Sequence, residues 1–282
     1  MVAETLTTSL DLRKVDISLL NQVINRYTNV CHLDFSNVRD FDDSNMQMLL
    51  PVREKLQSLK LRGTDLSSVK SFFDQSTMKR NMPLHTIDLS WTSISYESAV
   101  AIANCCPDLK SLKLSKCQGI SDAFMDCVSS TLPKLQVLDV SMCPITATGC
   151  RSLFSSTSLR EVNISACPEL HAQDIRTLVT GEIMEYNEND ASDNADTLNK
   201  AEFLMRRGSV SHLISISAQF MTGIDAGLLD VLAVHAPHLR RLDLRHYRAI
   251  NTADTPTFKM SLRKLQRKGV QVALSRRIES QL

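Results

Sequence analysis

The sequence predicts an α/β solenoid, a curved horseshoe in which short parallel strands form the concave face and helices form the convex face. The first observation behind this prediction is an apolar pattern, L-x-x-L-x-L, that returns many times along the 282-residue chain. The second is helical spacing of apolar residues between two copies, as in Phe124, Val128 and Leu132. The third is an aliphatic composition, since 43% of the residues are hydrophobic but only 5% are aromatic. Such a chain buries its apolar side chains between stacked repeats.

Each copy of the pattern predicts one short strand, because apolar side chains at alternate positions of a strand point to the same side. The copies that begin at Leu84, Leu109 and Leu135 lie 25 and 26 residues apart, which leaves room for a helical segment between strands. A partial copy, Leu10-x-Leu12, opens the chain. The eight fuller copies begin at Val30, Leu56, Leu84, Leu109, Leu135, Leu159, Leu213 and Leu239. One repeat cannot bury its own apolar side, so the repeats must stack.

A cysteine, threonine or methionine follows three residues after the last apolar position of most copies, and we expect this residue to turn the chain out of the strand. Cys117, Cys143 and Cys167 occupy this position, and we expect them to be buried and reduced, because a free cysteine packs as a small hydrophobe. No C-x-x-C pair exists among the eight cysteines, and the pair His235 and His238 fits a loop better than a zinc site. The sequence therefore predicts neither a metal site nor a cofactor.

The stretch from Cys106 to Asp122, CPDLKSLKLSKCQGISD, resembles the consensus of leucine-rich repeats of the cysteine-containing subtype. Cys167-Pro-Glu-Leu170 matches part of the same consensus, and the resemblance extends over residues 7–275. This subtype occurs in the repeat domains of F-box proteins and in antagonist-of-mitotic-exit proteins. The resemblance implies a repeat domain that binds other proteins. An F-box precedes the repeats in such proteins, whereas here the first repeat begins by Leu10, so we expect no F-box in this chain.

The segment between the copies at Leu159 and Leu213 is two repeats long and lacks the pattern. Within it, residues 181–197 hold six acidic residues and no Arg or Lys, which favours a mobile acidic loop or a degenerate repeat with a helix at 198–207. A calcium loop fits poorly, because the glycine turn and the terminal glutamate of an EF-hand are absent. The Arg-Arg-Gly sequence before Ser209 suggests a site for basophilic kinases.

The C-terminal residues 255–282 are predicted to form a basic cap and tail, with a helix and then a closing strand around Val272, because the end of a solenoid needs a cover. Residues 240–282 hold eleven Arg and Lys against three acidic residues, so this end carries a net charge of +8 while the whole chain carries +1. We expect this end to contact an acidic surface or RNA. The basic residues that we single out are Arg263, Lys264, Arg267 and Lys268. We expect residues 1–282 to form a single solenoid domain that includes this cap.

The polar positions of each strand are predicted to face the concave side, where a partner binds. The position between the last two apolar residues is charged in most repeats, and serine is frequent two residues later, which suggests a hydroxyl-rich surface. Trp91, the only tryptophan, stands at the rim with Met142, Phe220 and His246, and tryptophan is enriched at interface hot spots. The predicted partner-binding residues are Asp34, Lys60, Asp88, Trp91, Lys113, Asp139, Asn163, Asp243 and Arg245.

The sequence contains no motif that indicates an enzyme: there is no glycine-rich phosphate loop, no G-x-S-x-G and no H-E-x-x-H. A polar strand face is also a poor pocket for a small-molecule substrate. We therefore expect a non-catalytic protein–protein interaction scaffold that is a subunit of a larger assembly. Two alternatives stay open. One is substrate recognition in ubiquitin ligation with a separate F-box chain, and the other is RNA contact in a ribonucleoprotein through the basic end.

The sequence favours a cytoplasmic protein. No apolar stretch reaches the length of a membrane span, so we expect no membrane insertion. Residues Met1 to Leu10 have neither the basic start nor the apolar run of a secretory signal. A nuclear, ciliary or organellar complex is also compatible with these features.

Overall fold

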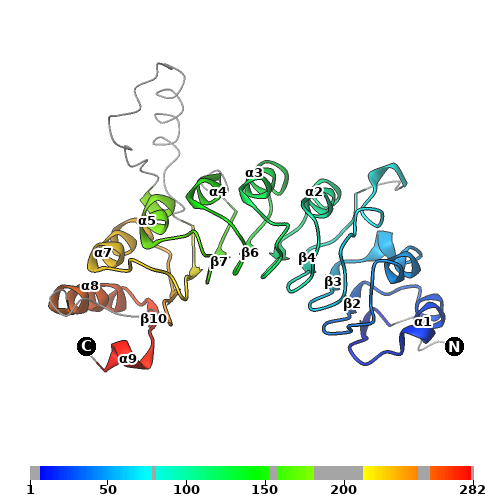
Figure 1. Ribbon diagram of the computed structural model, residues 1–282, viewed down its shortest axis with the longest axis horizontal. Helices are drawn as coiled ribbons and strands as arrows, with labels where there is room; N and C mark the ends of the chain where they lie inside the picture. Colours follow the sequence, from blue (N-terminus) through cyan, green and yellow to red (C-terminus); the bar gives the residue numbers. More distant parts are fainter. Residues whose placement is uncertain (1–6, 78–80, 153–157, 181–211, 247–254, 281–282) are drawn as a thin grey trace, which may run out of the picture. The chain divides into compact units, whose positions relative to one another are not determined.

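In the computed structural model, the chain divides into two compact units, Met1–Pro144 and Ile145–Leu282, which are described separately. In each unit, short parallel strands lie side by side, and helical segments cover one side of them (Figure 1). The structure describes residues 7–77, 81–152, 158–180, 212–246 and 255–280. The acidic segment 181–197, the helix predicted at 198–207 and Ser209 lie outside these residues.

Among its described residues, the first unit contains six strands, and each pairs in parallel and in register with the next. From the second strand onwards, the middle residue of each three-residue strand is the buried apolar residue of the pattern. Leu59, Ile87 and Leu112, for example, pair across three adjacent strands and are at most 1% exposed. The strands are β1 (Ser9–Asp11), β2 (His32–Asp34), β3 (Ser58–Lys60), β4 (Thr86–Asp88), β5 (Ser111–Lys113) and β6 (Val137–Asp139).

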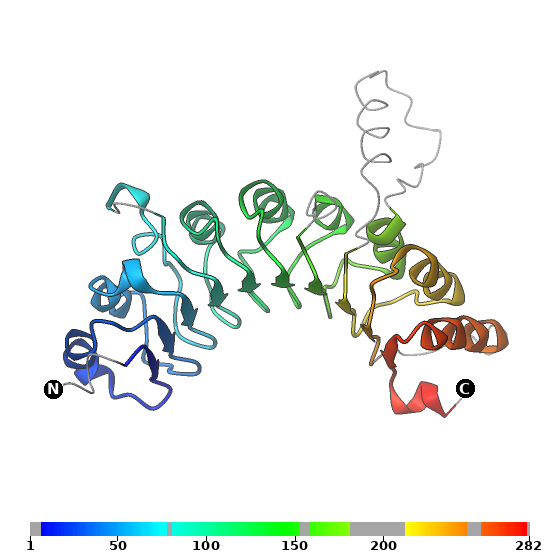
Figure 2. The ribbon, with the colours of Figure 1, turned by 180° about the vertical axis from the view of Figure 1, so that it is seen from behind.

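The segments that follow the strands change along the first unit. After β4 and β5 they are regular helices, α2 (Tyr96–Cys105) and α3 (Asp122–Thr131), which lie on one side of the strands (Figure 2). The earlier repeats return mainly through short 3-10 turns and contain larger core residues, such as Phe35 and Phe41, whose ring centroids are 4.4 Å apart. The elements of these repeats are η2 (Ile17–Leu19), α1 (Leu20–Arg26), η3 (Asn45–Leu49), η4 (Arg53–Lys55) and η5 (Gln75–Thr77).

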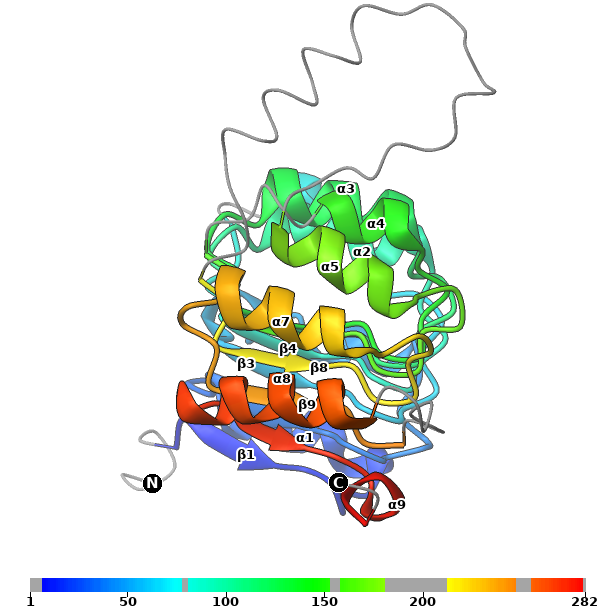
Figure 3. The ribbon, with the colours of Figure 1, turned by 90° about the vertical axis from the view of Figure 1, so that its left-hand side faces the viewer.

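The second unit repeats this arrangement, and its described strands also pair in parallel. Helix α5 packs on α7, and α7 packs on α8, so that the three helices lie side by side (Figure 3). The predicted C-terminal helix and closing strand are confirmed as α8 and β10. The elements are α4 (Ala147–Ser152), β7 (Glu161–Asn163), α5 (Ala172–Thr180), β8 (Ser215–Ser217), α7 (Ala226–His235), β9 (Arg241–Asp243), α8 (Thr255–Arg267), β10 (Gln271–Ala273) and α9 (Arg276–Glu279).

From β2 to β9, the turn out of each strand is made by a residue with left-handed backbone, one position before the residue that the sequence pattern predicts for this turn. Trp91 has a φ of 64° and Lys116 a φ of 59°. Non-glycine residues rarely adopt this conformation, but here a lateral bond holds it, since the Trp91 N–H donates to the Ser115 carbonyl at 2.7 Å. We call the residues at this position the left-handed row. They are Asn37, Gly63, Trp91, Lys116 and Met142 in the first unit, and Ala166, Phe220 and His246 in the second.

The expected buried thiols are confirmed, and they also serve as hydrogen-bond donors. Cys117 Sγ donates to the carbonyl of Leu89 at 3.2 Å, and Cys143 Sγ donates to the carbonyl of Leu114 at 3.1 Å, in each case in the preceding repeat. Burial is the main reason why the pKa of the Cys117 thiol is raised above its ordinary value, which favours the protonated thiol. All eight cysteines lie within the described residues and are thiols rather than disulfides.

Candidate protein-binding surface

The charged strand positions of the first unit form one continuous row. The strand register places Lys60 beside Asp88, Asp88 beside Lys113, and Lys113 beside Asp139. Because neighbouring parallel strands are about 4.8 Å apart, these charges alternate in sign along the sheet at close spacing. The middle residue of each strand points into the core, so its charged neighbour points to the opposite face, which we call the strand face. The sequence-predicted residues of this unit are therefore brought together on one surface.

The aspartates of this row cap the ends of their strands. Asp88 Oδ1 accepts the backbone N–H of Ser90 at 3.0 Å. Asp139 Oδ1 accepts both the N–H of Ser141, at 3.0 Å, and its hydroxyl, at 2.7 Å. In the second unit, the amide oxygen of Asn163 accepts the corresponding N–H at 3.1 Å. In these three repeats a side-chain oxygen accepts the backbone N–H, and Asn163 does so without a negative charge.

Because the acceptor oxygen and the negative charge have separate roles, two substitutions of Asp139 should give different results. Asp139→Asn should keep the free energy of unfolding within about 0.5 kcal/mol of the wild type, because the amide oxygen still accepts the N–H of Ser141. Asp139→Ala should lower it by about 1–2 kcal/mol, because both bonds are lost. Urea unfolding followed by circular dichroism measures the difference. Equal losses in the two variants would show that the charge, rather than the cap, stabilises the strand end.

Lys113 is the lysine of this row that remains available to a partner. Among the described residues it forms no ion pair, although Asp88 and Asp139 flank it in register. Lys60, by contrast, pairs with Asp34 at 3.5 Å. Burial raises the pKa of Asp34, but hydrogen bonds from Ser36 and the charge of Lys60 lower it by more, so its pKa lies below the ordinary value. Asp34 and Lys60 thus satisfy each other.

The serines two positions beyond the charged row do not form the open hydroxyl surface that the sequence suggested. Ser90, Ser115 and Ser141 are buried, and the hydroxyl oxygens of Ser115 and Ser141 lie 2.8 Å apart, within hydrogen-bond distance. They are covered because the repeats stack closely and the hydroxyls bond to one another across strands. The expectation of a hydroxyl-rich surface is therefore wrong at these three positions. Any contact at the strand face falls to the longer charged side chains and to the left-handed row.

Trp91 is the largest exposed side chain beside the charged row. Its left-handed backbone turns the indole outward, and the residue is 45% exposed. The Lys116 Nζ lies 4.1 Å from the ring centroid, and the Arg62 guanidinium carbon lies 5.8 Å from it, distances that are typical of cation–π contacts. We call Arg62, Trp91 and Lys116 the Trp91 cluster. Because its ring is already held by two cations, the cluster needs little ordering when a partner binds.

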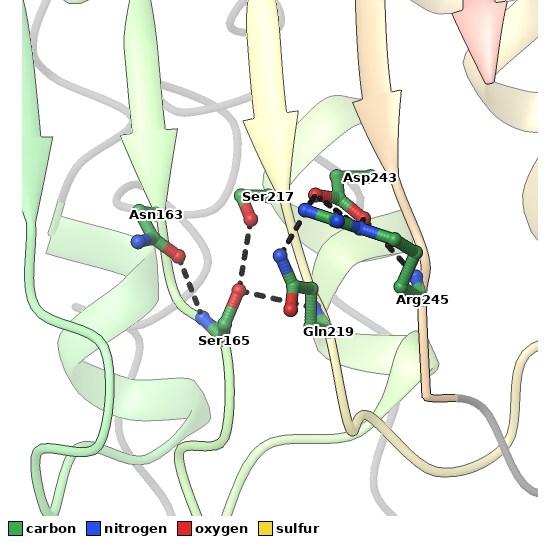
Figure 4. Close-up of polar contacts among 6 residues, drawn as sticks. All are labelled: Asn163, Ser165, Ser217, Gln219, Asp243 and Arg245. Carbon is green, nitrogen blue, oxygen red and sulfur yellow. Dashed lines mark hydrogen bonds and ion pairs between the residues drawn. The ribbon is translucent and has the colours of Figure 1, made fainter. Parts of the chain in front are cut away.

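In the second unit, the predicted binding residues are largely occupied with one another (Figure 4). Asp243 Oδ2 accepts from Gln219 Nε2 at 2.7 Å and from Arg245 Nη2 at 2.7 Å. Burial raises the pKa of Asp243, but the bonds from Arg245 and Gln219 outweigh it and leave the pKa lowered. The hydroxyls of Ser165 and Ser217 lie 2.9 Å apart in the same network. This network stabilises the sheet, so Asp243 and Arg245 are weaker candidates for partner contact than Lys113.

A second exposed aromatic lies in the left-handed row of this unit. Phe220 is 56% exposed, and its ring stacks on that of His246 with centroids 4.4 Å apart and planes 5° apart. The rim position predicted for these two residues and for Trp91 and Met142 is thus matched by their exposed place in the row. Phe220 has no cation in contact with its ring among the described residues, which distinguishes it from Trp91.

The basic end separates into two pairs of side chains. Lys264 Nζ pairs with Asp230 of α7 at 3.1 Å, and Lys268 Nζ donates to the carbonyl of Ala233 in the same helix. These two lysines therefore attach α8 to α7. Arg263 and Arg267 are exposed and form no ion pair among the described residues. Of the four predicted residues, the arginines are the ones left to contact a partner.

The described residues contain no cluster suited to metal-dependent or thiol chemistry. No three His, Cys, Asp or Glu side chains among them gather closely enough to hold a metal ion. A cleft of about 590 Å³ lies beside α2, with Lys70 and Cys105 in its wall. Burial is the main cause that raises the pKa of Cys105 to about 11, and its Sγ donates to the Phe73 carbonyl, so no thiolate forms at neutral pH.

No helix within the described ranges is long and apolar enough to cross a membrane.

The comparisons with known proteins agree with the repeat structure. A family model described as leucine-rich repeat matches residues 80–103 and 131–154. A chain of the yeast Rad7–Elc1 complex is 13% identical over 90% of this chain and 67% of its own length, with a TM-score of 0.57. No curated protein matches the sequence. The fold is therefore an α/β leucine-rich-repeat solenoid.

Two further solved structures are similar. TLR13, solved in complex with ssRNA13, is 15% identical over 95% of this chain, with a TM-score of 0.50, and this chain spans 32% of its length. The leucine-rich-repeat-containing protein LegL7 from Legionella pneumophila is 12% identical over 97% of this chain and 85% of its own, with a TM-score of 0.49. At such identities the likeness concerns the fold alone.

Proposed function

We propose that this chain is a non-catalytic interaction scaffold whose first unit binds a protein partner through Lys113 and the Trp91 cluster. The observation that carries the proposal is the exposed indole of Trp91, which is in cation–π contact with Arg62 and Lys116 and stands on a backbone fixed by a lateral hydrogen bond. A large, rigid aromatic side chain beside charged groups is the kind of anchor that dominates interface energies.

The charges around the anchor define the partner's chemistry. Arg62, Lys113 and Lys116 are cations, so the partner segment should carry carboxylates on both sides of an apolar side chain that packs on the indole. Asp88 and Asp139 lie beside Lys113 in the strand register. They would repel a partner whose carboxylates lie opposite these aspartates instead of opposite Lys113. The fixed charges thus set the register of the partner, while Trp91 supplies most of the affinity.

Several finer assignments belong to the same proposal. We assign the repeats to the cysteine-containing subtype, supported by the way Cys117 and Cys143 donate to carbonyls of the preceding repeat. We propose one solenoid domain over residues 1–282 with its C-terminal cap at 255–282. Eight reduced cysteines support a reducing compartment such as the cytoplasm. A surface that is fitted to one partner, without a catalytic group, supports a role as a subunit of a larger assembly.

The proposal is tested by capturing the partner of the tagged full-length chain and measuring its affinity for two matched variants. Lys113→Glu should weaken binding about tenfold or more, because it places a like charge against the partner's carboxylates. Lys70→Glu makes the same charge change at an exposed lysine beside α2 and should alter binding less than about twofold. Thermal melting of each variant checks that the fold is retained.

The same capture distinguishes the alternatives. Normal binding by Lys113→Glu, together with loss of binding when Arg263 and Arg267 become glutamate, would move the contact to the basic end and contradict the proposal. Co-purified RNA that disappears with those two arginines would instead indicate a ribonucleoprotein subunit. Stoichiometric capture of an Skp-type adaptor with a separate F-box chain would indicate substrate recognition in ubiquitin ligation.

A further inference from the structure

A small cationic cleft lies in the second unit, where three neighbouring strands begin. Its volume is about 320 Å³, and five residues line it: Arg160, His212, Ile214, His238 and Arg240. Three of these residues immediately precede strands: Arg160 precedes β7, Ile214 precedes β8 and Arg240 precedes β9. His212 lies two residues before Ile214 in the sequence, and His238 lies two residues before Arg240. Among the described residues, the lining therefore has two guanidinium groups and two imidazoles and no carboxylate.

The cleft is held in place by the repeat structure. The Ile214 N–H donates to the Arg160 carbonyl at 2.7 Å, and the Arg240 N–H donates to the Ile214 carbonyl at 2.8 Å. Each guanidinium is also directed by its own loop, since Arg160 Nη1 lies 3.3 Å from the Leu159 carbonyl and Arg240 Nη1 lies 3.1 Å from the Leu239 carbonyl. The two arginines thus have equivalent conformations, with one repeat between them.

The histidines complete the cleft. The rings of His212 and His238 are nearly parallel, at 15°, with centroids 6.5 Å apart. The structure thus pairs His238 with His212 rather than with His235, its neighbour in the sequence. Glu161, the acidic strand residue that follows Arg160 in the sequence, pairs with Arg241 at 2.9 Å. The side chains that face the cleft are therefore donors of N–H groups to a negatively charged ligand.

From this geometry we infer that the cleft binds the phosphate group of a phosphorylated serine or threonine on a partner protein. A phosphate monoester offers three acceptor oxygens and close to two negative charges, which two guanidinium forks and two imidazoles can match. Because adjacent strands are about 4.8 Å apart, Arg160 and Arg240 start about 10 Å apart, which leaves room for one phosphate between their forks. The site is separate from the surface proposed above and stands without it.

Two features favour a peptide over RNA as the source of the phosphate. Ile214 is 37% exposed between the two arginines and offers an apolar contact to the side chain next to the phosphorylated residue. A nucleic acid would need cations along a track of several phosphates and an open aromatic face for its bases. The cleft has one cluster of cations rather than a track of them. Its two imidazole rings face each other, so neither offers an open face on which a base could stack.

The inference is tested on the full-length chain by following the imidazole signals of the histidines in NMR spectra during titration. Four probes are compared: an acetylated Ala-phosphoserine-Ala amide, the same peptide without phosphate, inorganic phosphate and a short oligouridylate. The phosphopeptide should shift the signals of His212 and His238 together and saturably, and the unphosphorylated peptide should shift neither. It should also bind at least about tenfold more tightly than inorganic phosphate, since it adds contacts to the phosphate.

Variants of the arginines give the decisive comparison. Arg240→Gln should weaken phosphopeptide binding about tenfold or more, and Arg240→Lys should weaken it less, because it retains the charge but loses the fork. Arg263→Gln, at an exposed arginine of α8, is the matched control and should have no effect. Equal affinity for phosphate and phosphopeptide, tighter binding of oligouridylate at the same histidines, or an unsaturable shift would each overturn the inference. Amide spectra of the variants establish that they are folded.

Discussion

Replacing Cys143 with aspartate should destabilise the first unit by about 3–5 kcal/mol, the largest effect expected for a single change in this chain. The Cys143 side chain is fully buried, and its Sγ donates to the carbonyl of Leu114 at 3.1 Å. A carboxylate at this point would carry an unpaired charge in the core and would face another acceptor. Urea unfolding of the full-length chain, followed by circular dichroism, measures the loss.

Two controls show whether charge burial is the cause. Cys143→Thr should cost less than about 1.5 kcal/mol, because Thr64 and Thr92 occupy the same position in other repeats and donate to the carbonyls of Leu61 and Leu89. The penalty in C143D should also shrink at acidic pH. Burial raises the folded-state pKa of the introduced carboxyl, so stability is retained below the unfolded-state pKa and lost as pH rises through the folded-state value. A penalty that is independent of pH, or equal in C143T, would indicate a steric cause instead.

The strands could be predicted from the sequence because their pattern is enforced by burial. A residue such as Leu112 must point inward between stacked repeats, and a shift by one position would expose it. The pattern therefore persists in all eight fuller copies, including the weak copy around Ile216. The helical segments were less predictable. In the first repeats large side chains such as Phe72 and Phe73 fill the core, and short 3-10 turns replace regular helices.

The candidate surface could be predicted only in part. The charged row could be predicted from the alternation of side chains along a strand. The left-handed row could not, because Trp91 and Lys116 have no intrinsic preference for a positive φ. The sequence did contain a signal: Gly63 and Asn37, two residues that tolerate positive φ, stand at the same position of other repeats. The Asp-x-Ser spacing, as in Asp139-Val-Ser141, likewise marks a local cap that is easily mistaken for a surface charge.

The role of each basic residue at the C-terminal end could also not be predicted without the structure. Composition gave the charge of the end, but it did not show that Lys264 and Lys268 bind to α7, whereas Arg263 and Arg267 are exposed and form no ion pair among the described residues. Spacing along a helix fixes which residues share a face, whereas the neighbouring helix decides which of them are engaged. A charge-rich segment therefore predicts a surface more reliably than it predicts the residues that bind.

Replacing Trp91 with glycine should weaken partner binding by about 1–3 kcal/mol, or between about fivefold and 150-fold, while the fold stays intact. Glycine is the informative substitution, because the residue has a φ of 64° and Gly63 occupies the same position in the preceding repeat. Trp91→Ala should bind as weakly as Trp91→Gly but should be about 1 kcal/mol less stable, because alanine retains the cost of the left-handed backbone. The affinity thus reports on the indole side chain of Trp91, and the stability in urea reports on its backbone conformation.

The matched control for this variant is Phe220→Gly in the second unit. Phe220 has the same backbone conformation, with a φ of 61°, and is exposed to a similar extent, but no cation contacts its ring among the described residues. If the partner is anchored by an aromatic ring held between Arg62 and Lys116, Phe220→Gly should leave affinity within about twofold of the wild type. Equal losses for both variants would mean that the partner follows the left-handed row through both units. If Trp91→Gly binds the partner with normal affinity, Trp91 is not the anchor. The proposal that the partner binds to the first unit would then lose its main support.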